Sequence, residues 1–410
     1  MSHAASSSPP FPRQVLAINC GSSTLKFELR EISPTGPIRT VAHGTVDRIG
    51  GQATVDFRHE GGWSAHEKAE IADHGRAVER TLRWLADGGG LSSIGLALAH
   101  RVVHGGARFT APAVIDDAVL REIDALTELA PLHNGPALSA IRAARTYLGG
   151  GVPMVAVFDT AFHRTLPPHA ASYAIPLELA RKHRVQRYGF HGLAHRYMAQ
   201  RYAAIAGNDT SRLIALQLGN GCSAAAIAAG RSVETSMGFT PLEGLMMGTR
   251  SGDGDPSLPA YLAQREGVTV AEVDEWLNRK AGLLGVSGSS RDMRDLLERS
   301  CQGDERATLA IDMFCYRVRK CIGAYLAVLG GADAILFGGG IGENAPAIRA
   351  RICQGMEWCG LLLDSKHNDA VIGSESRISS ELARLHVHVI KVDEAAILVE
   401  DALACLHDHV

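Results

Sequence analysis

The stretch that decides the fold is VLAINCGSSTLKFELR, residues 15–30. Residues 15–18 are a continuous apolar run, which is typical of a strand buried on both faces. After the polar residues 19–24, apolar and polar side chains alternate from Leu25 to Arg30, and this alternation predicts a half-buried strand. We therefore expect two strands joined by a tight polar turn.

The turn of this hairpin carries groups that suit an anion. Gly21 permits positive φ, and small side chains with hydroxyl or amide groups stand around it. Such a turn directs backbone N–H groups and hydroxyls toward one point, and Lys26 adds a positive charge nearby. A Gly–Ser turn is usually only a turn, so this segment alone is a weak indication of a phosphate site.

A second hairpin of the same design follows about half a chain later. Residues 213–218 are again an apolar run, and the turn 219–223 leads into another short strand through Ile227. Two similar hairpins that open two halves predict a duplicated domain with a cleft between the copies. A third glycine-rich loop, residues 338–344, follows a strand and leads into a helix that Asn344 would cap, with Pro346 in its first turn. Three such loops favour a nucleotide-binding protein.

Composition restricts the class of protein. A length of 410 residues allows two or three domains, and 46% hydrophobic with 21% charged residues is ordinary for a globular chain. The net charge of −3 gives no reason to expect nucleic acid or a membrane surface as a partner. The 8 cysteines include no Cys-x-x-Cys pair, which favours a reducing cytoplasm over disulfides or zinc. Residues 1–12 are rich in Ser and Pro, so we expect a disordered tail rather than a signal peptide.

The rest of the chain reads as strands alternating with helices, which predicts an α/β fold. Thr269 and Glu272 form a capping box at the start of one helix. The polar stretch 163–169 interrupts the alternation and is the expected hinge into the second half. We predict helices over residues 74–85, 117–129, 136–148, 304–329 and 395–406 and buried strands over 154–158, 334–337 and 387–392.

Polar residues follow several of the buried strands. Ligands of α/β sheets bind at the carboxyl ends of strands, so these residues are candidates for a site. Any one of them alone more often begins a loop, but a set with two carboxylates, an arginine and glycine loops favours a common site. The set is Asn19, Arg101, Asp159, Gly219–Gly221, Gly338–Gly342 and Glu394.

The run SMGFTPLEGLMMGTRSGD, residues 236–253, is too rich in glycine for a helix and too apolar for a solvent loop. Its apolar residues are poorly periodic. We expect it to line a pocket and to deliver Arg250 there, because a merely buried connection would not explain an arginine in an apolar segment.

Several long, irregular strings closely resemble the acetate kinases, of the acetokinase branch of the sugar kinase, heat-shock ATPase and actin superfamily. The resemblance covers Val15 to about Leu406. It rests on residues 19–26, 100–106, 131–134, 158–163, 187–195, 218–223, 236–256 and 340–344. It implies duplicated ribonuclease H-like (actin-like ATPase) domains with a nucleotide cleft between them. Residues 13–161 plus 395–410 would form the carboxylate and metal side, and residues 162–394 the nucleotide side with a dimer interface.

The resemblance also implies residue roles. Arg101 would hold the substrate carboxylate, His191 and Arg250 would stabilise the phosphoryl group in transit, and Asp159 would be the active-site aspartate. Asn19 and Glu394 would lie beside Mg²⁺, for which Mn²⁺ is an alternative. Val103, Leu132, Phe190 and Pro241 would line the pocket for the acetate methyl group. The nucleotide would be surrounded by Lys26, Gln217, Leu218, Gly219, Asn220, Gly221, Asp292, Met293, Arg294, Gly340, Ile341, Gly342, Glu343 and Asn344.

The implied reaction is the reversible, direct in-line transfer of the ATP γ-phosphoryl group to acetate, which gives acetyl phosphate and ADP. A carboxylate acceptor is already ionised at neutral pH, so it needs no general base. It needs cancellation of the repulsion between two anions, which arginines, a histidine and a metal ion supply. We therefore interpret Asp159 as orienting the metal or an arginine rather than abstracting a proton.

Two alternatives stay open at this point. A propionate or butyrate kinase is the nearest, because one methylene is worth only about 1–3 kcal/mol of discrimination. A nucleotide-driven switch of the actin or heat-shock type is more distant, since it would leave Arg101 and Arg250 without a role. A cytoplasmic homodimer is implied by the resemblance. The sequence departs from the family at Gln217, where histidine is usual, at residues 193–194 and at residues 391–393.

Overall fold

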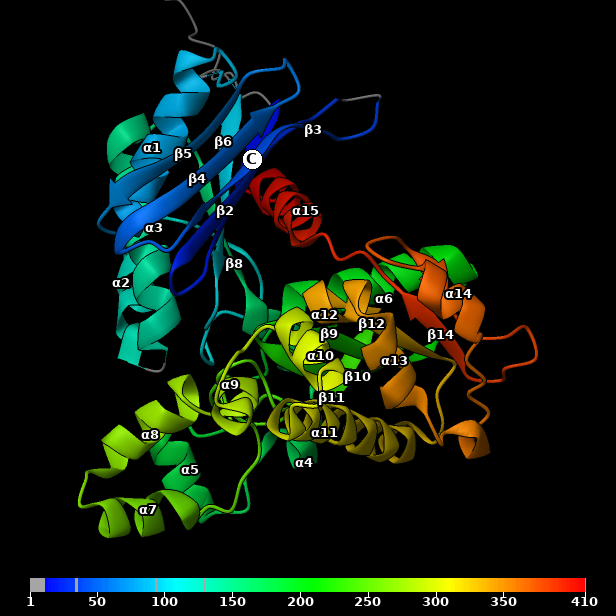
Figure 1. Cartoon of the computed structure of the whole chain (residues 1–410). Helices are drawn as coiled ribbons and strands as arrows, with labels where there is room; N and C mark the ends of the chain where they lie inside the picture. The colour runs from blue at the N-terminus through cyan, green and yellow to red at the C-terminus, as the bar shows by residue number, and fades with distance from the viewer. Residues whose placement is uncertain (1–11, 34–35, 93–94, 129, 410) are drawn as a thin grey trace, which may run out of the picture. The chain divides into compact units, whose positions relative to one another are not determined.

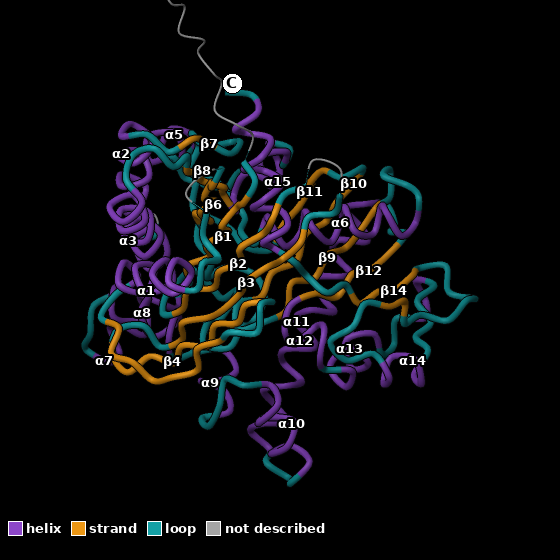
Figure 2. Tube along the Cα trace, turned by 90° about the horizontal axis from the view of Figure 1, so that it is seen from above, coloured by secondary structure: helices purple, strands orange, loops and turns teal. Residues whose placement is uncertain are grey.

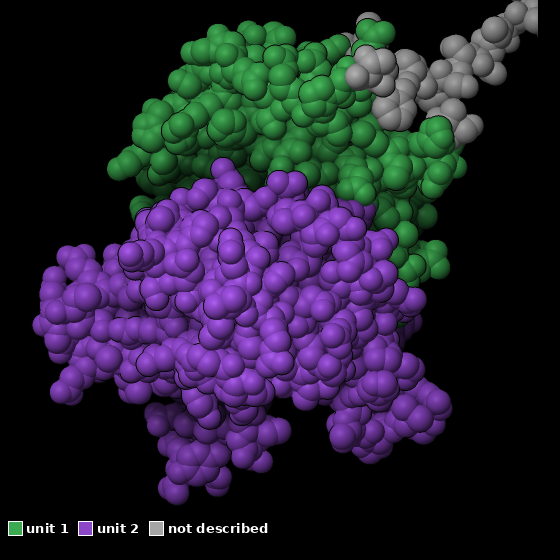
Figure 3. Space-filling view, turned by 90° about the vertical axis from the view of Figure 1, so that its right-hand side faces the viewer, with its two compact units in different colours: residues 1–161, 393–410 green, residues 162–392 purple. Residues whose placement is uncertain are grey.

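The structure is a computed structural model that describes residues 12–33, 36–92, 95–128 and 130–409, without the side chains of 131–133. Residues 1–11 of the predicted tail lie outside this range. The chain divides into two compact units, residues 1–161 with 393–410 and residues 162–392 (Figure 3). No helix among the described residues is long and apolar enough to cross a membrane.

The first unit is built on a mixed sheet in the order β5-β4-β3-β2-β1-β6-β8-β7 (Figure 1). Its helices are α1 (His74–Asp87), α2 (Asp117–Ala125), η1 (Leu126–Glu128), α3 (Pro131–Leu148) and α15 (Glu394–His407). Its strands are β1 (Gln14–Cys20), β2 (Thr24–Glu31), β3 (Arg39–Asp47), β4 (Gly51–His59), β5 (Ser64–Ile71), β6 (Leu96–Val102), β7 (Ala113–Val114) and β8 (Met154–Phe158).

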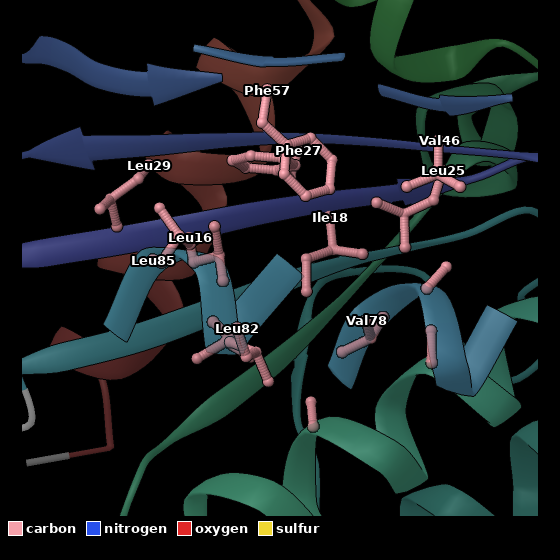
Figure 4. Packing of buried hydrophobic residues seen from close by; sticks show 14 of the residues in the cluster. Leu16, Ile18, Leu25, Phe27, Leu29, Val46, Phe57, Val78, Leu82 and Leu85 are labelled. Atoms are coloured by element: carbon pink, nitrogen blue, oxygen red, sulfur yellow. The ribbon is translucent and has the colours of Figure 1, made fainter. Parts of the chain in front are cut away.

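Strand β1 is buried on both faces, as its apolar run predicts. Leu16 and Ile18 belong to a core with Leu25 and Phe27 of β2 and with Leu82 of α1 (Figure 4). Because side chains alternate along a strand, the residues between them face the opposite side, where α15 contacts β1, β6 and β8. Each buried Leu or Phe contributes roughly 1.5–3 kcal/mol, so the predicted hairpin is the centre of this unit's core.

The helix predicted over 136–148 begins earlier, at Pro131. In the sequence, Pro136 suggests the start of a helix, because a proline has no N–H to donate within a helix. In the structure it lies inside α3, near the first turns of that helix. Pro131 occupies the first helical position, where a missing N–H costs nothing. Residues 131–134, which the sequence predicts as a loop, are therefore helical.

The second unit carries a six-stranded sheet in the order β11-β10-β9-β12-β14-β13 (Figure 2). Helix α6 (Gly192–Ala206) packs on one face, where Met198 and Tyr202 join Leu213 and Leu336 in a core. The strands are β9 (Arg212–Leu218), β10 (Cys222–Ala228), β11 (Arg231–Thr235), β12 (Ala334–Gly338), β13 (Ser376–Arg377) and β14 (His386–Val389).

The helices of this unit confirm several predicted ends. The capping box of Thr269 and Glu272 starts α8, and the long helix α11 has Asp304 as its N-cap and Gly330 as its C-cap. The helical element η2 (Asp159–Thr165) begins in the first unit and ends in the second. The others are α4 (Pro168–Ala171), α5 (Leu177–His183), α6 (Gly192–Ala206), α7 (Leu258–Glu266), α8 (Val270–Arg279), α9 (Gly282–Ser287), α10 (Met293–Cys301), α11 (Glu305–Leu329), α12 (Gly339–Asn344), α13 (Pro346–Cys353), η3 (Glu357–Cys359) and α14 (Ser365–Ala370).

The third glycine-rich segment is not a loop, contrary to the prediction. It forms the short helix α12, in which the Asn344 side chain donates from Nδ2 to the carbonyl of Gly340. Asn344 therefore does not cap the next helix, whose N-cap is Ala345 without a side-chain bond. Pro346 stands in the first turn of α13 as predicted.

The two sheets share one pairing scheme, which confirms the predicted duplicated α/β fold. Strand β1 pairs antiparallel with β2 and parallel with β6, and β9 pairs antiparallel with β10 and parallel with β12. The next strands, β8 and β14, are again parallel to their neighbours. The turns at residues 19–24 and 219–221 therefore occupy equivalent positions in the two units, because each joins the first antiparallel pair of strands of its sheet.

Buried neutral histidines give the fold a dependence on pH. Burial lowers the pKa of His100 in β6 to about 3, whereas an unfolded chain binds that proton near pH 6.5. The unfolded state therefore gains protons first as the pH falls, and stability is lost by about 1.4 kcal/mol per pH unit below 6.5. We expect the free energy of unfolding of His100→Leu to fall less between pH 7 and pH 5, by about 2 kcal/mol, in denaturant titrations. An equal slope for His100→Leu and the exposed control His43→Leu would contradict this.

Candidate active site

Arg101 and Asp159 form a buried ion pair in the first unit. They lie at the carboxyl ends of the parallel neighbours β6 and β8. Nε of Arg101 donates to Oδ1 of Asp159 at 2.9 Å, and Nη2 donates to Oδ2 at 2.5 Å. The Asp159 side chain is 0% exposed and that of Arg101 is 12% exposed. Asp159 thus holds the guanidinium by two bonds, which fits an orienting role rather than a proton-abstracting one.

Asn19 connects this pair to Glu394. Its Oδ1 accepts from Nη1 of Arg101 at 2.9 Å, and its Nδ2 donates to Oε2 of Glu394 at 2.7 Å. The structure therefore brings together four predicted residues from three strand ends and a helix start. Burial alone would lower the pKa of Arg101, but the charges of Asp159 and Glu394 raise it above its ordinary value. Arg101 therefore stays a cation at neutral pH.

Glu394 is positioned by a contact that the sequence does not predict. It is the first residue of α15, and the N-cap Asp393 accepts from the N–H of Ala396 at 2.9 Å. Nη2 of Arg30 on β2 pairs with Asp393 at 2.6 Å and with Glu28 at 2.7 Å. Asp393 is one of the residues at which the sequence departs from its family, and here it fixes the start of the helix that carries Glu394.

The loop after β6 is held by hydrogen bonds to side chains of α3 and η2. The Asn134 side chain accepts from the N–H of His104 and donates to its carbonyl, and Thr160 accepts from the N–H of Gly105. Val103 in this loop is buried. Leu132 lies outside the residues whose side chains are described.

The Asn19 turn itself is mostly open to solvent. Lys26 is exposed and stands opposite Asn19 in the β1–β2 register. The imidazole Nε2 of His74, at the start of α1, lies 2.8 Å from the carbonyl oxygen of Gly21 and holds the turn against the helix.

In the second unit, His191 and Arg250 converge on Gly221. A Cβ built on Gly221 would lie 3.5 Å from Nε2 of His191 and 3.9 Å from Nη1 of Arg250. In the same way, a Cβ on Gly219 would lie 3.9 Å from the backbone nitrogen of Gly340. The turn 219–221, the start of α12 and two donor side chains therefore surround one region. A guanidinium, an imidazole and backbone N–H groups that converge in this way suit an anion such as a phosphoryl group.

Arg250 reaches this region from the segment 236–253, which forms neither helix nor strand, as predicted. Its Nη1 donates to the carbonyl of Pro241 at 2.9 Å. Burial lowers its pKa from the ordinary value, and no carboxylate among the described residues pairs with it. A half-buried guanidinium without a counter-ion is costly, so a binding anion would stabilise it.

His191 is held in a backbone conformation that few residues adopt. Its φ is 56° and ψ is 30°, at the N-cap of α6. The preceding carbonyl, of Phe190, lies 3.1 Å from Nε2 of the buried His163. A Cβ on Gly189 would come within 2.6 Å of the His163 ring, so only glycine fits there. His163 and Gly189 thus determine how the chain enters His191.

Helix α12 is held at both ends by charged side chains. Oε1 of Glu343 accepts from the N–H groups of Gly339 at 3.0 Å and Val392 at 3.2 Å. The fully buried Arg349 on α13 donates to the carbonyl of Gly342 at 2.9 Å and to Asn368 on α14. Burial lowers the pKa of Arg349 to about 10, and the nearby Cys353 and Asp369 oppose this shift only in part. The sequence does not single out Arg349, because Arg351 stands in the same apolar segment with a side chain that is 39% exposed.

The remaining predicted residues lie in several places. Gln217 stands opposite Ser223 and Gly338 in the sheet, and its Oε1 is buried without a hydrogen-bond partner in the described structure. Asp292 caps α10 and pairs with the exposed Arg294, while Met293 between them is buried in the core. Phe190 is buried and Pro241 half-buried in the second unit, whereas Val103 belongs to the first. The pocket that they would share stays a prediction.

The candidate metal ligands offer oxygen atoms. Mg²⁺ is usually held by one or two protein oxygens together with substrate phosphates and water, so Asn19 and Glu394 fit this ion. Among the described residues, no group of three or more His, Cys, Asp or Glu could hold a metal by protein ligands alone.

The duplicated actin-like ATPase fold and the two clusters define a phosphotransferase. The sequence model of the acetokinase family matches residues 14–400. The chain belongs to the acetokinase family, which confirms the resemblance. It is 48% identical to the acetate kinase of Solibacter usitatus, over 96% of this chain and 98% of that protein.

Two solved structures have the same fold. The acetate kinase of Porphyromonas gingivalis is 40% identical with a TM-score of 0.87, covering 96% of this chain and 99% of that one. A propionate kinase of Francisella tularensis is 38% identical with a TM-score of 0.87, covering 95% and 98%.

Proposed function

We propose that this chain is an ATP:acetate phosphotransferase that interconverts acetate and ATP with acetyl phosphate and ADP. The observation that carries the proposal is the convergence of His191 Nε2 and Arg250 Nη1 on Gly221. In this proposal the phosphoryl group passes beside these two donors, and family membership supports acetate as the acceptor.

On the carboxylate side, Arg101 is the group that would bind acetate. A guanidinium has five N–H groups, and the bonds to Asp159 and Asn19 use three of them. One N–H on each terminal nitrogen is left to receive a carboxylate as a fork. Because Asp159 and Asn19 prevent rotation, binding would cost little side-chain entropy.

Transfer itself calls for charge stabilisation. The acceptor is ionised, and the moving phosphoryl group spreads negative charge over its oxygens. Arg250 and His191 would stabilise that charge directly. Mg²⁺, held by Glu394 and Asn19 when the nucleotide is bound, would neutralise phosphate charge.

A propionate kinase is the second candidate, because a solved structure of that name is 38% identical to this chain. Trapping the acyl phosphate as hydroxamate with acetate, propionate and butyrate tests both. We expect the highest kcat/KM for acetate. A higher value for propionate would establish the second candidate, and no acyl phosphate from any of the three would refute the proposal.

Gly340 is expected to select ATP. A Cβ there would meet nothing within 4 Å, so space lies beside the start of α12. Gly340→Gln should fill that space and raise the KM for ATP at least tenfold, while the KM for acetate changes little. Steady-state kinetics with ATP and pyrophosphate measure this. Gly323→Ala, with open space on α11, is the matched control. Equal turnover of the native chain with pyrophosphate and ATP would contradict the assignment.

We also propose a cytoplasmic homodimer formed through the second unit. Large apolar side chains are exposed along α11, with Tyr316 63% and Val328 53% exposed. Trp358, which lines one pocket together with Leu326 of α11, is 71% exposed. Exposed apolar groups of this size are typical of an interface. Sedimentation of Tyr316→Arg beside the native chain would test it, since a dimer through this face should dissociate.

A further inference from the structure

His191 is oriented by two buried side chains. Its Nδ1 lies 2.9 Å from Oγ of Ser223, and Nε2 of His195 lies 2.7 Å from the same oxygen. Ser223 is on β10 and His195 is one turn along α6, and both are 0% exposed. A hydroxyl has one hydrogen to donate. Of the two rings, therefore, one receives that hydrogen and the other donates its own.

The other ring nitrogen of His195, Nδ1, decides which ring donates to Ser223 and which one accepts from it. Among the described residues, Nδ1 of His195 is buried and has no hydrogen-bond partner. A buried N–H without an acceptor is rarer than an unpaired acceptor, so the proton of His195 belongs on Nε2. Burial, with the nearby His163 and His191, holds the pKa of His195 well below its ordinary value, so the ring is neutral. His195 then donates to Ser223, and Ser223 donates to Nδ1 of His191.

We propose that His195 and Ser223 are positioning residues that fix His191 in its Nε2–H tautomer. This inference rests on the proposed function, in which His191 faces the phosphoryl group. The ring then directs an N–H, not a lone pair, to the region that it shares with Arg250. A neutral imidazole becomes a donor in this way without having to be charged.

The tautomer also predicts how the rate responds to pH. The titratable groups around His191 are His195 on α6, His163 on η2, Arg250 across Gly221, and Cys222 beside Arg250. Burial raises the pKa of the Cys222 thiol to about 12, so it stays neutral. In this tautomer the neutral ring of His191 keeps its Nε2–H, so the donor is still present after imidazolium has lost its other proton. The kcat of the native chain should therefore not fall as the pH rises from 6 to 8.

The direct test is NMR of the full chain labelled with ¹⁵N-histidine, without ligands. The His191 signals are identified by their loss in His191→Gln. In the native chain Nε2 should carry the proton and Nδ1 should not. In Ser223→Ala the two tautomers should mix. Ser232→Ala is the matched control, because it removes the hydroxyl that lies 2.8 Å from Nδ1 of His163. It should change the His163 signals and leave the proton of His191 on Nε2.

Steady-state kinetics of Ser223→Ala test the positioning role independently of the NMR spectrum. In Ser223→Ala, kcat should fall about 10- to 100-fold, with the KM for both substrates changed less than twofold. Its kcat should also rise as the pH falls from 8 to 6, because imidazolium carries a proton on both nitrogens. Ser223→Thr, which keeps the hydroxyl, should restore the native tautomer.

Two results would overturn the proposal. One is a proton on Nδ1 of His191 in the native chain, and the other is an unchanged tautomer in Ser223→Ala. Should Ser223→Ala not fold, the native spectrum still decides. A chain that makes no acyl phosphate would refute the proposed function, while the spectrum would still report the tautomer.

Discussion

Arg250→Ala should lower kcat by about a thousandfold or more, because arginines that stabilise a phosphoryl group in transit contribute about 10³–10⁵ in rate. Arg250 is half-buried, has no carboxylate partner among the described residues and shares the Gly221 region with His191. The KM for acetate should change far less than kcat, because the contact strengthens as charge develops.

Two variants make this result specific. Arg250→Lys keeps the charge but not the planar fork, so it should recover only part of kcat. Arg279→Ala on α8 removes an exposed arginine, 58% exposed and 3.9 Å from Glu275, and should leave kcat unchanged. Steady-state kinetics in both directions measure all three. A kcat within tenfold of the native value in Arg250→Ala would remove Arg250 from the site.

Asp159→Ala should have the largest effect on stability. It leaves the Arg101 guanidinium almost buried without its bidentate partner, and breaking a buried pair from one side costs about 3–5 kcal/mol. Released from Asp159, Arg101 should also bind acetate more weakly, so the KM for acetate should rise. Urea titration and steady-state kinetics measure the two effects.

The matched control is an exposed pair in the same unit. Arg145 donates to Asp117 at 2.5 Å, but the two side chains are 39% and 73% exposed. Asp117→Ala should cost less than about 1 kcal/mol, because water screens exposed pairs. If Asp159→Ala and Asp117→Ala had equal unfolding free energies, Asp159 would not hold a buried cation.

Local patterns predicted those parts of the fold that depend on neighbouring residues. The apolar runs at 15–18 and 213–218 became central strands, and the capping box and the ends of the long helix were correct. The start of α3 and the helical state of residues 339–344 were missed, because Pro136 and the glycines indicate a break that tertiary packing overrides.

The site was predictable as a set of residues but not as a network. Strand ends and resemblance selected Asn19, Arg101, Asp159 and Glu394, which the structure joins by hydrogen bonds. The residues that position these four side chains could not be predicted from the sequence. Arg30 meets Asp393 across 363 positions of the chain, and such partners have no local pattern.

The chain crosses between the two units twice, and at the second crossing two consecutive residues are each held by a side chain of their own unit. Val392, the last residue of the second unit, is tied by its N–H to Glu343, which also holds the first residue of α12. Its neighbour Asp393 is tied to Arg30 in the first unit. Anchors on consecutive residues leave a tether one peptide long. A displacement of α12 on nucleotide binding would therefore be transmitted as tension to Glu394, and a glycine inserted after Val392 should relax it.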